Sequence, residues 1–424
     1  MNSSDGNNSF LLLAKLPPYE GGERYTEHDC DQGHEMRLVY GSNAAEFEAY
    51  CNRLIGDGFA ETARYALNGN LFRTLQNVQG LTVHTYLVAY SGEVRIIAAQ
   101  NPTRQTDIPK EGDYPTFLKP LTADGGMGYL LRLNDGSFIV IDGGYGKREI
   151  CVTQLYEALK ANAPDPEHIV ISCWIFTHGH HDHIGAFVEF VPRYFAESCF
   201  EIKSFLHNMC LTPEQSQYLD NGTTYQALET VERYYPKVPV YFALTGQIYR
   251  FANAAIEILY TIEDYMPKCI ENEADATPED PLKGNGNIQS VVFRVTVNGH
   301  TLFFMADTAT VCCNEMCNRY GATMKSEYVQ MAHHGHGDER PRARNATKEI
   351  YDMIAPRYGL LPCRANQVAQ KLTLPINQYL VELIGGVENL ISSGGCEENI
   401  LLEPTEQNPK SIYIKEKKHE TKPI

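Results

Sequence analysis

Four histidines and one aspartate crowd into six consecutive residues of this chain, and all five side chains can bind a metal ion. They are His178, His180, His181, Asp182 and His183. Burying that many imidazoles with a carboxylate is costly in a dry core unless a bound ion satisfies them. The spacing His-x-His-x-Asp-His predicts two neighbouring sites, the first from His178 and His180 and the second from Asp182 and His183. Imidazole combined with carboxylate favours zinc first, then iron or manganese.

The segments on either side of this cluster predict how it is positioned. Residues 169–176 form an apolar run of the kind found in buried strands, and the run gives way to the first histidine after Thr177. Residues 185–194 are expected to form a helix with its N-terminus beside the metals. A histidine-rich loop in solvent is the alternative reading. The density of ligands directly after a strand favours the metal site.

The stretch from Thr177 to Gly185 resembles the signature of the metallo-β-lactamase superfamily, Thr-His-x-His-x-Asp-His-x-Gly, at every fixed position. The resemblance covers about residues 120 to 405. It implies an α/β fold, namely an αββα sandwich that gathers its ligands at strand ends. In that family an aspartate at a strand end, matched here by Asp142, usually supports the site without binding metal. His181 and Gly179 are spacers in this reading.

Two later motifs follow in the order that the superfamily has them. Asp307, in Phe-Phe-Met-Ala-Asp-Thr, resembles the bridging carboxylate; an aspartate in a solvent-facing turn is the alternative. His333, His334 and Gly335 resemble the His-His-Gly of the ComEC-like branch, which usually continues with Ser where this chain has His336. One of His333 and His334 is expected to be the last ligand, and the sequence leaves open which. His336 is expected to face the substrate or to orient a ligand, which makes it a candidate catalytic residue.

A lone histidine between these motifs commonly completes the first metal site in the superfamily. His207 lies in that interval, at the end of an expected strand over 202–206, but it lacks the usual small neighbours. A capped or surface histidine is therefore an equal alternative. With His207 included, the resemblance implies these ligands for two divalent ions: His178, His180, Asp182, His183, His207, Asp307, His333 and His334.

Two metal ions at such a centre would hold a bridging hydroxide and lower its pKa towards neutrality. Asp182 would bind one ion and orient the nucleophile or relay a proton to the leaving group. The first hypothesis is a metal-dependent hydrolase, with a small phosphodiester as the substrate that the ComEC-like resemblance implies. The alternatives are a thioesterase or lactonase of the same fold, a flavodiiron-like oxidoreductase and a non-catalytic metal-binding protein. The retained His180 argues against the flavodiiron branch, which usually has glutamate there.

The chain is acidic, with 53 Asp and Glu residues against 36 Lys and Arg and a net charge of -17. This balance argues against binding of duplex nucleic acid, because each phosphate would meet a repelling surface. The expected partner is a small-molecule substrate. No stretch is long and apolar enough to suggest a membrane span, and no signal peptide is convincing. Twelve cysteines without a Cys-x-x-Cys pair fit free thiols in the cytoplasm. Nothing in the sequence indicates the oligomeric state.

A chain of 424 residues is long for one domain, and two are predicted. Residues 1–115 are expected to form a small α+β domain of unknown role, and residues 116–424 the metallo-β-lactamase-like domain. The segment 101–120, rich in Pro, Asp, Lys and Thr, reads as a linker. The first domain should contain a helix over 46–54 and two hairpins, with strands at 64–67, 71–75, 81–90 and 93–99.

The second domain is predicted to mix strands and helices. A hairpin joins strands at 128–133 and 137–141 across Asn134-Asp135-Gly136. Further helices are expected at 150–159, 223–235, 347–354 and 377–383. Further strands are expected at 238–243, 247–251, 255–260, 288–297, 301–305, 328–332 and 359–361.

Overall fold

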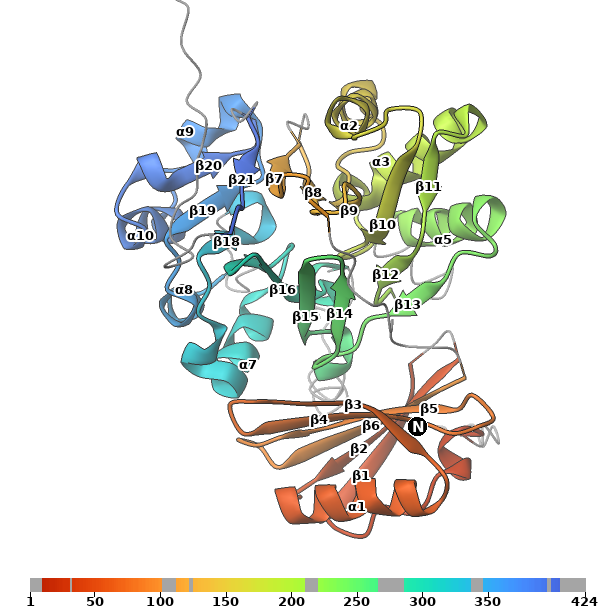
Figure 1. Ribbon diagram of the computed structural model, residues 1–424. Helices are drawn as coiled ribbons and strands as arrows, with labels where there is room; N and C mark the ends of the chain where they lie inside the picture. The colour runs from red at the N-terminus through yellow and green to blue at the C-terminus, as the bar shows by residue number, and fades with distance from the viewer. Residues whose placement is uncertain are drawn as a thin grey trace, which may run out of the picture.

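The computed structural model describes residues 10–30, 33–100, 112–121, 125–209, 220–265, 286–336, 346–394 and 398–404. Residues 101–111 of the predicted linker lie outside this description. An antiparallel sheet with one helix comes first in the chain, and a sandwich of two sheets between helices follows it (Figure 1).

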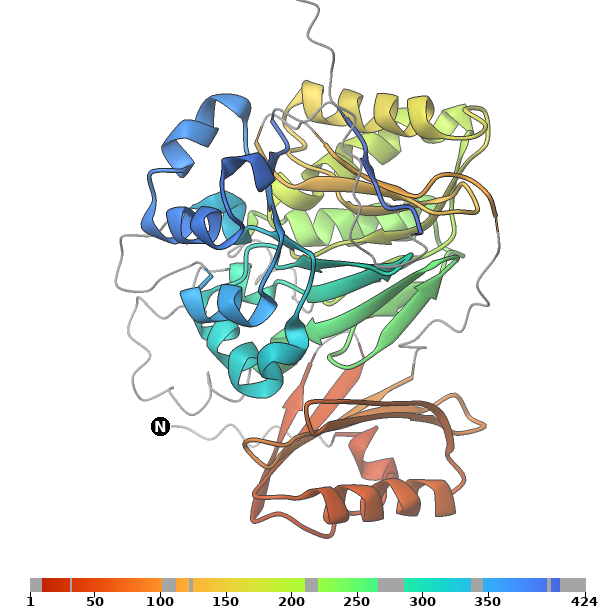
Figure 2. The same cartoon turned by 60° about the vertical axis from the view of Figure 1, so that its left-hand side comes forward.

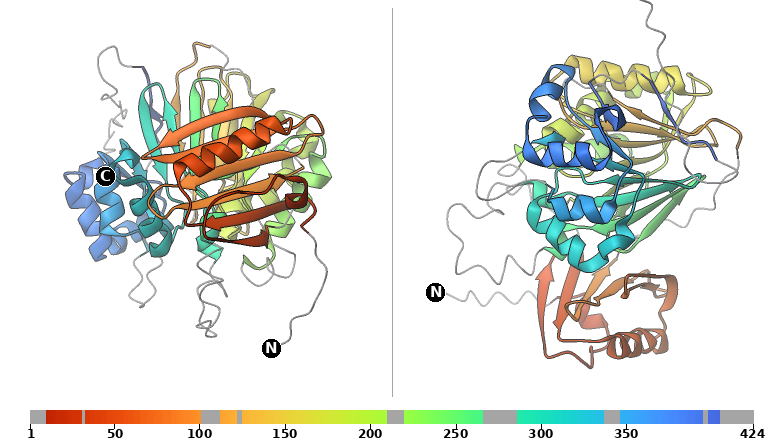
Figure 3. Two further views of the ribbon diagram at one scale, coloured as in Figure 1. Left: turned by 90° about the horizontal axis from the view of Figure 1, so that it is seen from below. Right: turned by 90° about the vertical axis from the view of Figure 1, so that its left-hand side faces the viewer.

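The N-terminal sheet has six antiparallel strands in the order β1-β2-β6-β5-β4-β3. The strands are β1 (Arg24–Asp29), β2 (His34–Tyr40), β3 (Ala60–Leu67), β4 (Asn70–Gln76), β5 (Thr82–Val88) and β6 (Glu93–Ala99). Helix α1 (Ala44–Gly56) begins where the Asn43 side chain accepts hydrogen bonds from two backbone N–H groups of its first turn. It buries Phe47, Tyr50 and Leu54 against the sheet face that points away from the sandwich (Figures 2 and 3).

The first sheet of the sandwich carries the histidine cluster. Its strands are β7 (Phe117–Pro120), β8 (Gly128–Arg132), β9 (Phe138–Asp142), β10 (Ile169–Ile175), β11 (Phe200–Ile202), β12 (Phe205–His207), β13 (Val240–Phe242) and β21 (Ile400–Leu401). Strands β7, β8 and β9 are antiparallel, whereas β9, β10, β12 and β13 run parallel. Parallel neighbours end at the same edge, so the ends of β9 and β10 bring their following residues together.

The second sheet supplies the remaining candidate ligands. Its order is β14-β15-β16-β17-β18-β19-β20. The strands are β14 (Ile248–Phe251), β15 (Ala254–Tyr260), β16 (Val292–Val297), β17 (His300–Phe304), β18 (Tyr328–Gln330), β19 (Tyr358–Leu361) and β20 (Leu390–Ser392). Because β17, β18 and β19 are parallel, Asp307 and the residues after β18 leave the sheet at one edge.

Helices cover both outer faces of the sandwich. On the first sheet they are α2 (Glu149–Asn162), α3 (His181–Tyr194) and α5 (Thr223–Tyr234). Helices α7 (Thr310–Tyr320), α8 (Lys348–Ile354), α9 (Val368–Lys371) and α10 (Pro375–Leu383) follow strands of the second sheet. One apolar cluster lies between the sheets and another beneath the first group of helices, so the predicted αββα sandwich is confirmed. Among the described helices, none combines the length and apolarity that a membrane crossing requires.

The N-terminal sheet packs directly on the sandwich with its other face (Figure 2). Phe72 and Tyr86 belong to the same buried cluster as Leu259 and Met316. The Tyr86 hydroxyl donates to Asp264 over 2.8 Å, inside this contact. The predicted division into domains at residue 115 stays a prediction, but the two parts share a continuous core.

Candidate metal centre

The histidine cluster follows β10 without a break. His178 is buried, His180 occupies the N-cap position of α3, and Asp182 and His183 lie in its first turn. The helix therefore begins at His181, four residues earlier than predicted, so both members of the second ligand pair are helical. A helix N-terminus supports a carboxylate there, because it carries partial positive charge.

Gly179 is more than a spacer. A Cβ at this position would lie 2.0 Å from the Thr224 hydroxyl and 2.4 Å from an Asp220 carboxylate oxygen. Only glycine leaves room for the loop to pass between the histidines and the start of α5. Asp220 is one of the charges that raise the pKa of His180, against the larger lowering effect of burial. The only sequence signal for Asp220 was its position just before the helix predicted at 223–235.

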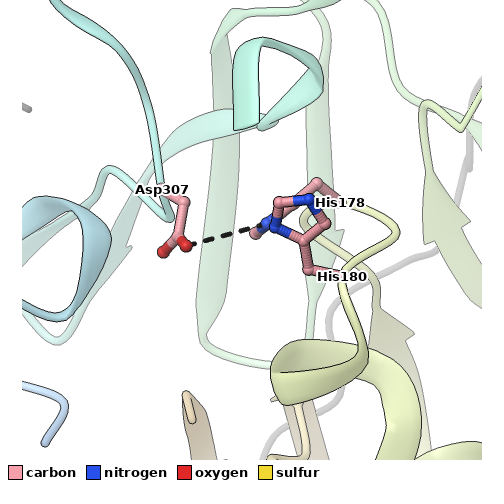
Figure 4. Close-up of side chains that lie close together, drawn as sticks. All are labelled: His178, His180 and Asp307. Atoms are coloured by element: carbon pink, nitrogen blue, oxygen red, sulfur yellow. Dashed lines mark ion pairs between the residues drawn. The ribbon is translucent and has the colours of Figure 1, made fainter. Parts of the chain in front are cut away.

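Asp307 lies between the two ligand pairs, as its resemblance to a bridging carboxylate implied. Its Oδ2 is 3.9 Å from His178 Nε2, and its Oδ1 is 3.1 Å from His183 Nε2 (Figure 4 draws the His178 pair). The preceding Ala306 adopts a left-handed backbone with φ of 48°, which a small residue tolerates best. The side chain is 2% exposed, so an aspartate in a solvent-facing turn is excluded.

His333 and His334 both have left-handed backbones, with φ of 50° and 54°. Two successive non-glycine residues in this region are rare, and such strain clusters at functional sites. The turn places the two rings differently. His334 Nε2 lies 3.2 Å from Asp182 Oδ2, whereas His333 Nε2 lies 3.7 Å from Asp307 Oδ2.

Two groups of three residues therefore present ligand atoms to a common point, with the atoms of each group within 4.8 Å of one another. The first group is His178, His180 and Asp307, and the second is Asp182, His183 and His334. Figure 4 shows the first group converging from the loop after β10 and from the second sheet.

Hydrogen bonds fix the ring nitrogens so that the groups suit a metal ion. His183 Nδ1 donates to Asp142 Oδ2 over 2.7 Å, and His334 Nδ1 donates to the Pro362 carbonyl over 3.0 Å. Their Nε2 atoms are left facing each other at 3.1 Å. His178 Nε2 is buried without a hydrogen-bond partner. These Nε2 atoms are therefore placed to bind a cation, which would give each of them a partner.

Asp142 supports the site as the resemblance implied. Its Oδ1 accepts from the Thr177 N–H over 2.8 Å, and its Oδ2 accepts from the Thr177 hydroxyl over 2.7 Å and from His183. The carboxylate is fully buried and ends β9 in a left-handed conformation with φ of 53°. It therefore ties β9, the loop after β10 and helix α3 together.

Charge and burial compete in this centre. Burial and the neighbouring histidines His183 and His180 hold the pKa of His178 well below its ordinary value. Burial alone would lower the pKa of His334, but Asp307 and Asp182 raise it to about 9. Burial would raise the pKa of Asp307, yet the surrounding histidines hold it well below its usual range. The carboxylate is therefore ionised and available to a cation.

His207 is the predicted ligand that the structure does not bring to the centre. Like His333, it belongs to neither group of converging ligands among the described residues, but His333 Nε2 lies 3.7 Å from Asp307 Oδ2. It ends β12, but its ring lies between Phe176 and Phe242, with centroids 6.4 Å and 6.1 Å away. Burial lowers the pKa of His207 to about 4, so the ring is neutral. The expected role of His207 as a metal ligand is not supported by this geometry.

His336 lies at the exposed rim of the site, with its ring centroid 5.3 Å from that of His333. Desolvation and the charge of Lys371 lower the pKa of His336 to about 4, which keeps the imidazole neutral. Asn287, which the sequence did not single out, lies with its Nδ2 3.4 Å from His333 Nε2. No sequence motif surrounds Asn287. Its place at the site becomes clear only in the fold, where β16 and β18 lie on either side of β17.

Comparisons with known proteins agree with this assignment of the fold. Residues 121–199 match the family model of the Metallo-beta-lactamase superfamily, and this region holds Asp142 and the histidine cluster. The match supports the superfamily, whereas the ComEC-like branch stays a prediction. No curated protein matches the chain.

Solved structures give weaker likenesses. The metallo-beta-lactamase fold protein YhfI from Bacillus subtilis is 15% identical, over 66% of this chain and 96% of that one, with a TM-score of 0.38. The diiron beta-hydroxylase CmlA from Streptomyces venezuelae is 13% identical, over 68% and 53%, with a TM-score of 0.38. Zn(2+)-bound PqqB from Methylobacterium extorquens is 8% identical, over 49% and 60%, with a TM-score of 0.31. Scores this low carry no conclusion about metal or substrate.

Proposed function

We propose that this protein, which has the metallo-β-lactamase fold, is a metal-dependent hydrolase that cleaves a small phosphodiester. The observation that carries the proposal is the position of Asp307, whose two carboxylate oxygens face His178 on one side and His183 on the other. A carboxylate that faces two groups of ligands would hold two ions close enough together for a dinuclear centre.

The first ion would be held by His178, His180, Asp307 and His333, and the second by Asp182, His183, His334 and Asp307. His333 takes the place expected for His207, because its Nε2 faces the same Asp307 oxygen as His178 does, at 3.7 Å and 3.9 Å. Both members of the His-His pair are then ligands, one to each ion. Zinc suits this set of imidazoles and carboxylates best, and manganese or iron is the alternative.

When bound, the two ions would supply Lewis-acid activation of water and of a phosphoryl oxygen. The protein supplies orientation and proton movement. Asp182 is ionised and its carboxylate is one-third exposed, so it can accept a proton from water or pass one to the leaving group. His336, held neutral at the rim, can donate or accept a hydrogen bond to the substrate.

A small phosphodiester reconciles the motif with the charge of the protein. The His-His-Gly at 333–335 resembles the ComEC-like branch, which is associated with nucleic-acid processing. The net charge of -17 repels long polyanions. A short substrate would meet the local positive charge of the centre and little of the remaining surface.

A panel containing an aryl phosphodiester, a thioester, a lactone and a β-lactam tests the reaction class on zinc- and manganese-loaded protein. We expect turnover of the phosphodiester above the other three. Turnover of the lactone or thioester alone would reject the phosphodiester and keep the fold's hydrolytic chemistry. A coloured protein that retains iron and consumes oxygen would reject hydrolysis in favour of oxidoreductase chemistry.

A pair of variants tests the ligand assignment. His333→Ala should weaken one of two zinc-binding steps, because it removes a ligand of the first ion. His207→Ala should leave both steps unchanged. Competition of each protein with a chromophoric chelator measures the two affinities. Loss of zinc from the His207 variant and retention by the His333 variant would reverse the assignment.

A further inference from the structure

Lys371 is a buried lysine whose ammonium group has no hydrogen-bond partner among the residues that the structure describes. It is the last residue of α9 and is 4% exposed. Burying an unpaired cation is costly, and buried charges in folded proteins are almost always paired. Lys371 therefore has three donors available to something other than the described protein atoms.

The fold fixes Lys371 beside the metal centre. Asn377 Nδ2 donates to the Lys371 carbonyl over 2.9 Å and to the Gly335 carbonyl over 2.7 Å. The end of α9 is thus tied to the strained turn that carries His333 and His334. Removal from water lowers the pKa of Lys371 to about 8, opposed by Cys363 and by Asp307. The same charge acts on His336.

We propose that Lys371 binds an anionic oxygen of the substrate's phosphoryl group on the side of the metal centre that faces His336. The inference rests on the proposed function and specifies which part of the substrate the site recognises. A compact ammonium with free donors suits a phosphoryl oxygen as a point charge. Its positive charge, on which Asp307 acts, would partly offset the negative charge of that carboxylate for an approaching anion. Lys371 would therefore select substrates with an ionised oxygen over neutral esters of the same size.

Direct binding of inorganic phosphate to the zinc-loaded full-length protein tests this inference without relying on turnover. Lys371→Met keeps the length and apolar character of the stem but has no charge and no donor. We expect this variant to bind phosphate at least about tenfold more weakly by calorimetry. The reason is that one hydrogen bond to a charged group typically contributes about tenfold or more to a binding constant. Lys371→Arg should recover most of the affinity. Lys325→Met, at an exposed lysine after the helical turn Gly321–Met324, is the matched control and should bind as the wild type does.

Elemental analysis of the same samples separates the two proposals. Lys371→Met should retain the zinc content of the wild type, since Lys371 is not a ligand. If Lys371→Met cannot be obtained folded, Lys371→Gln replaces it with the same expected loss. Wild-type affinity for phosphate in the uncharged variant would overturn the role of Lys371. Tight phosphate binding that depends on Lys371, together with no hydrolysis of any ester by the wild type, would overturn the hydrolase proposal instead.

Discussion

Replacing Asp142 by Asn should weaken zinc binding at the second site while leaving the fold intact. Asn occupies nearly the same volume and tolerates the left-handed backbone that Asp142 adopts at φ of 53°. The carboxylate now accepts three hydrogen bonds, from the Thr177 N–H, the Thr177 hydroxyl and His183 Nδ1. An amide has only one acceptor oxygen, so its NH2 group must face at least one of these donors in either orientation.

The expected loss of zinc affinity follows from the hydrogen-bond acceptor that His183 Nδ1 loses in this variant. Without an acceptor for its Nδ1 proton, the ring shifts towards the tautomer that carries the proton on Nε2, the atom that faces His334 and Asp307. Changes to such outer partners of metal-binding histidines typically cost about 10- to 100-fold in metal affinity, or roughly 1.4 to 2.7 kcal/mol. The first site, to which His183 contributes no ligand, should lose much less zinc affinity.

Chelator competition on the full-length protein measures both affinities, and circular dichroism checks the fold. Asp135→Asn is the matched control, because Asp135 accepts hydrogen bonds from Ser137 in a hairpin turn and belongs to neither ligand group. It should bind zinc as the wild type does. Two wild-type affinities in Asp142→Asn would refute the claim that this carboxylate sets the tautomer of His183.

Three further predictions follow from individual side chains. Asp182→Ala should abolish hydrolysis and remove one zinc ion per chain without unfolding the protein; wild-type turnover would contradict its role. Neighbouring carboxylates raise the pKa of His334 to about 9 and that of His183 well above its ordinary value, so zinc must displace protons from these rings. Zinc affinity at the second site should therefore rise at least about tenfold per pH unit from pH 7 towards 9, measured by chelator competition. Burial lowers the pKa of His84 and of His207 to about 4, below the ordinary 6.5, so the unfolded chain binds protons first as pH falls. The free energy of unfolding of the metal-free protein, measured in urea, should therefore fall by roughly 2 kcal/mol per histidine between pH 7 and 5. In His84→Gln this decrease should be smaller by the contribution of one histidine.

The histidine cluster was predictable because its geometry is local. His178 to His183 are adjacent in sequence, and the strand before them and the helix after them are both encoded by apolar spacing. The sequence could not separate His333 from His334, because their two left-handed backbones are set by the fold around them. Nor could it show that the His207 ring points between Phe176 and Phe242.

Several elements escaped prediction, and α7 and β1 show the physical reasons. Helix α7 buries Glu315 and Arg319 on its inner side, where they pair with each other at 2.9 Å, and these charges break the apolar pattern of a buried helix. Strand β1 is polar and partly exposed, so only its pairing with β2 identifies it. Lys371 carried no signal in the sequence, because only the fold shows that it is buried and that its Nζ has no hydrogen-bond partner among the described residues.

The N-terminal part was predicted to be a domain of its own, and buried polar contacts join it to the sandwich. Arg319 pairs with Asp264 over 2.6 Å, and Asp264 also accepts from Tyr86 of β5. His84 of β5 lies with its Nε2 2.9 Å from the Thr245 carbonyl in the sandwich. Removing the first sheet would expose these buried polar groups together with the apolar cluster around Phe72.

The metal content of carefully purified and reconstituted protein tests the central claim most directly. Two ligand groups, with Asp307 facing a histidine of each, predict two ions per chain, with zinc as the preferred metal. Elemental analysis after removal of excess metal should therefore give a ratio of two. A ratio of one or none, with no gain when zinc, manganese or iron is supplied, would contradict the dinuclear centre and the hydrolase built on it.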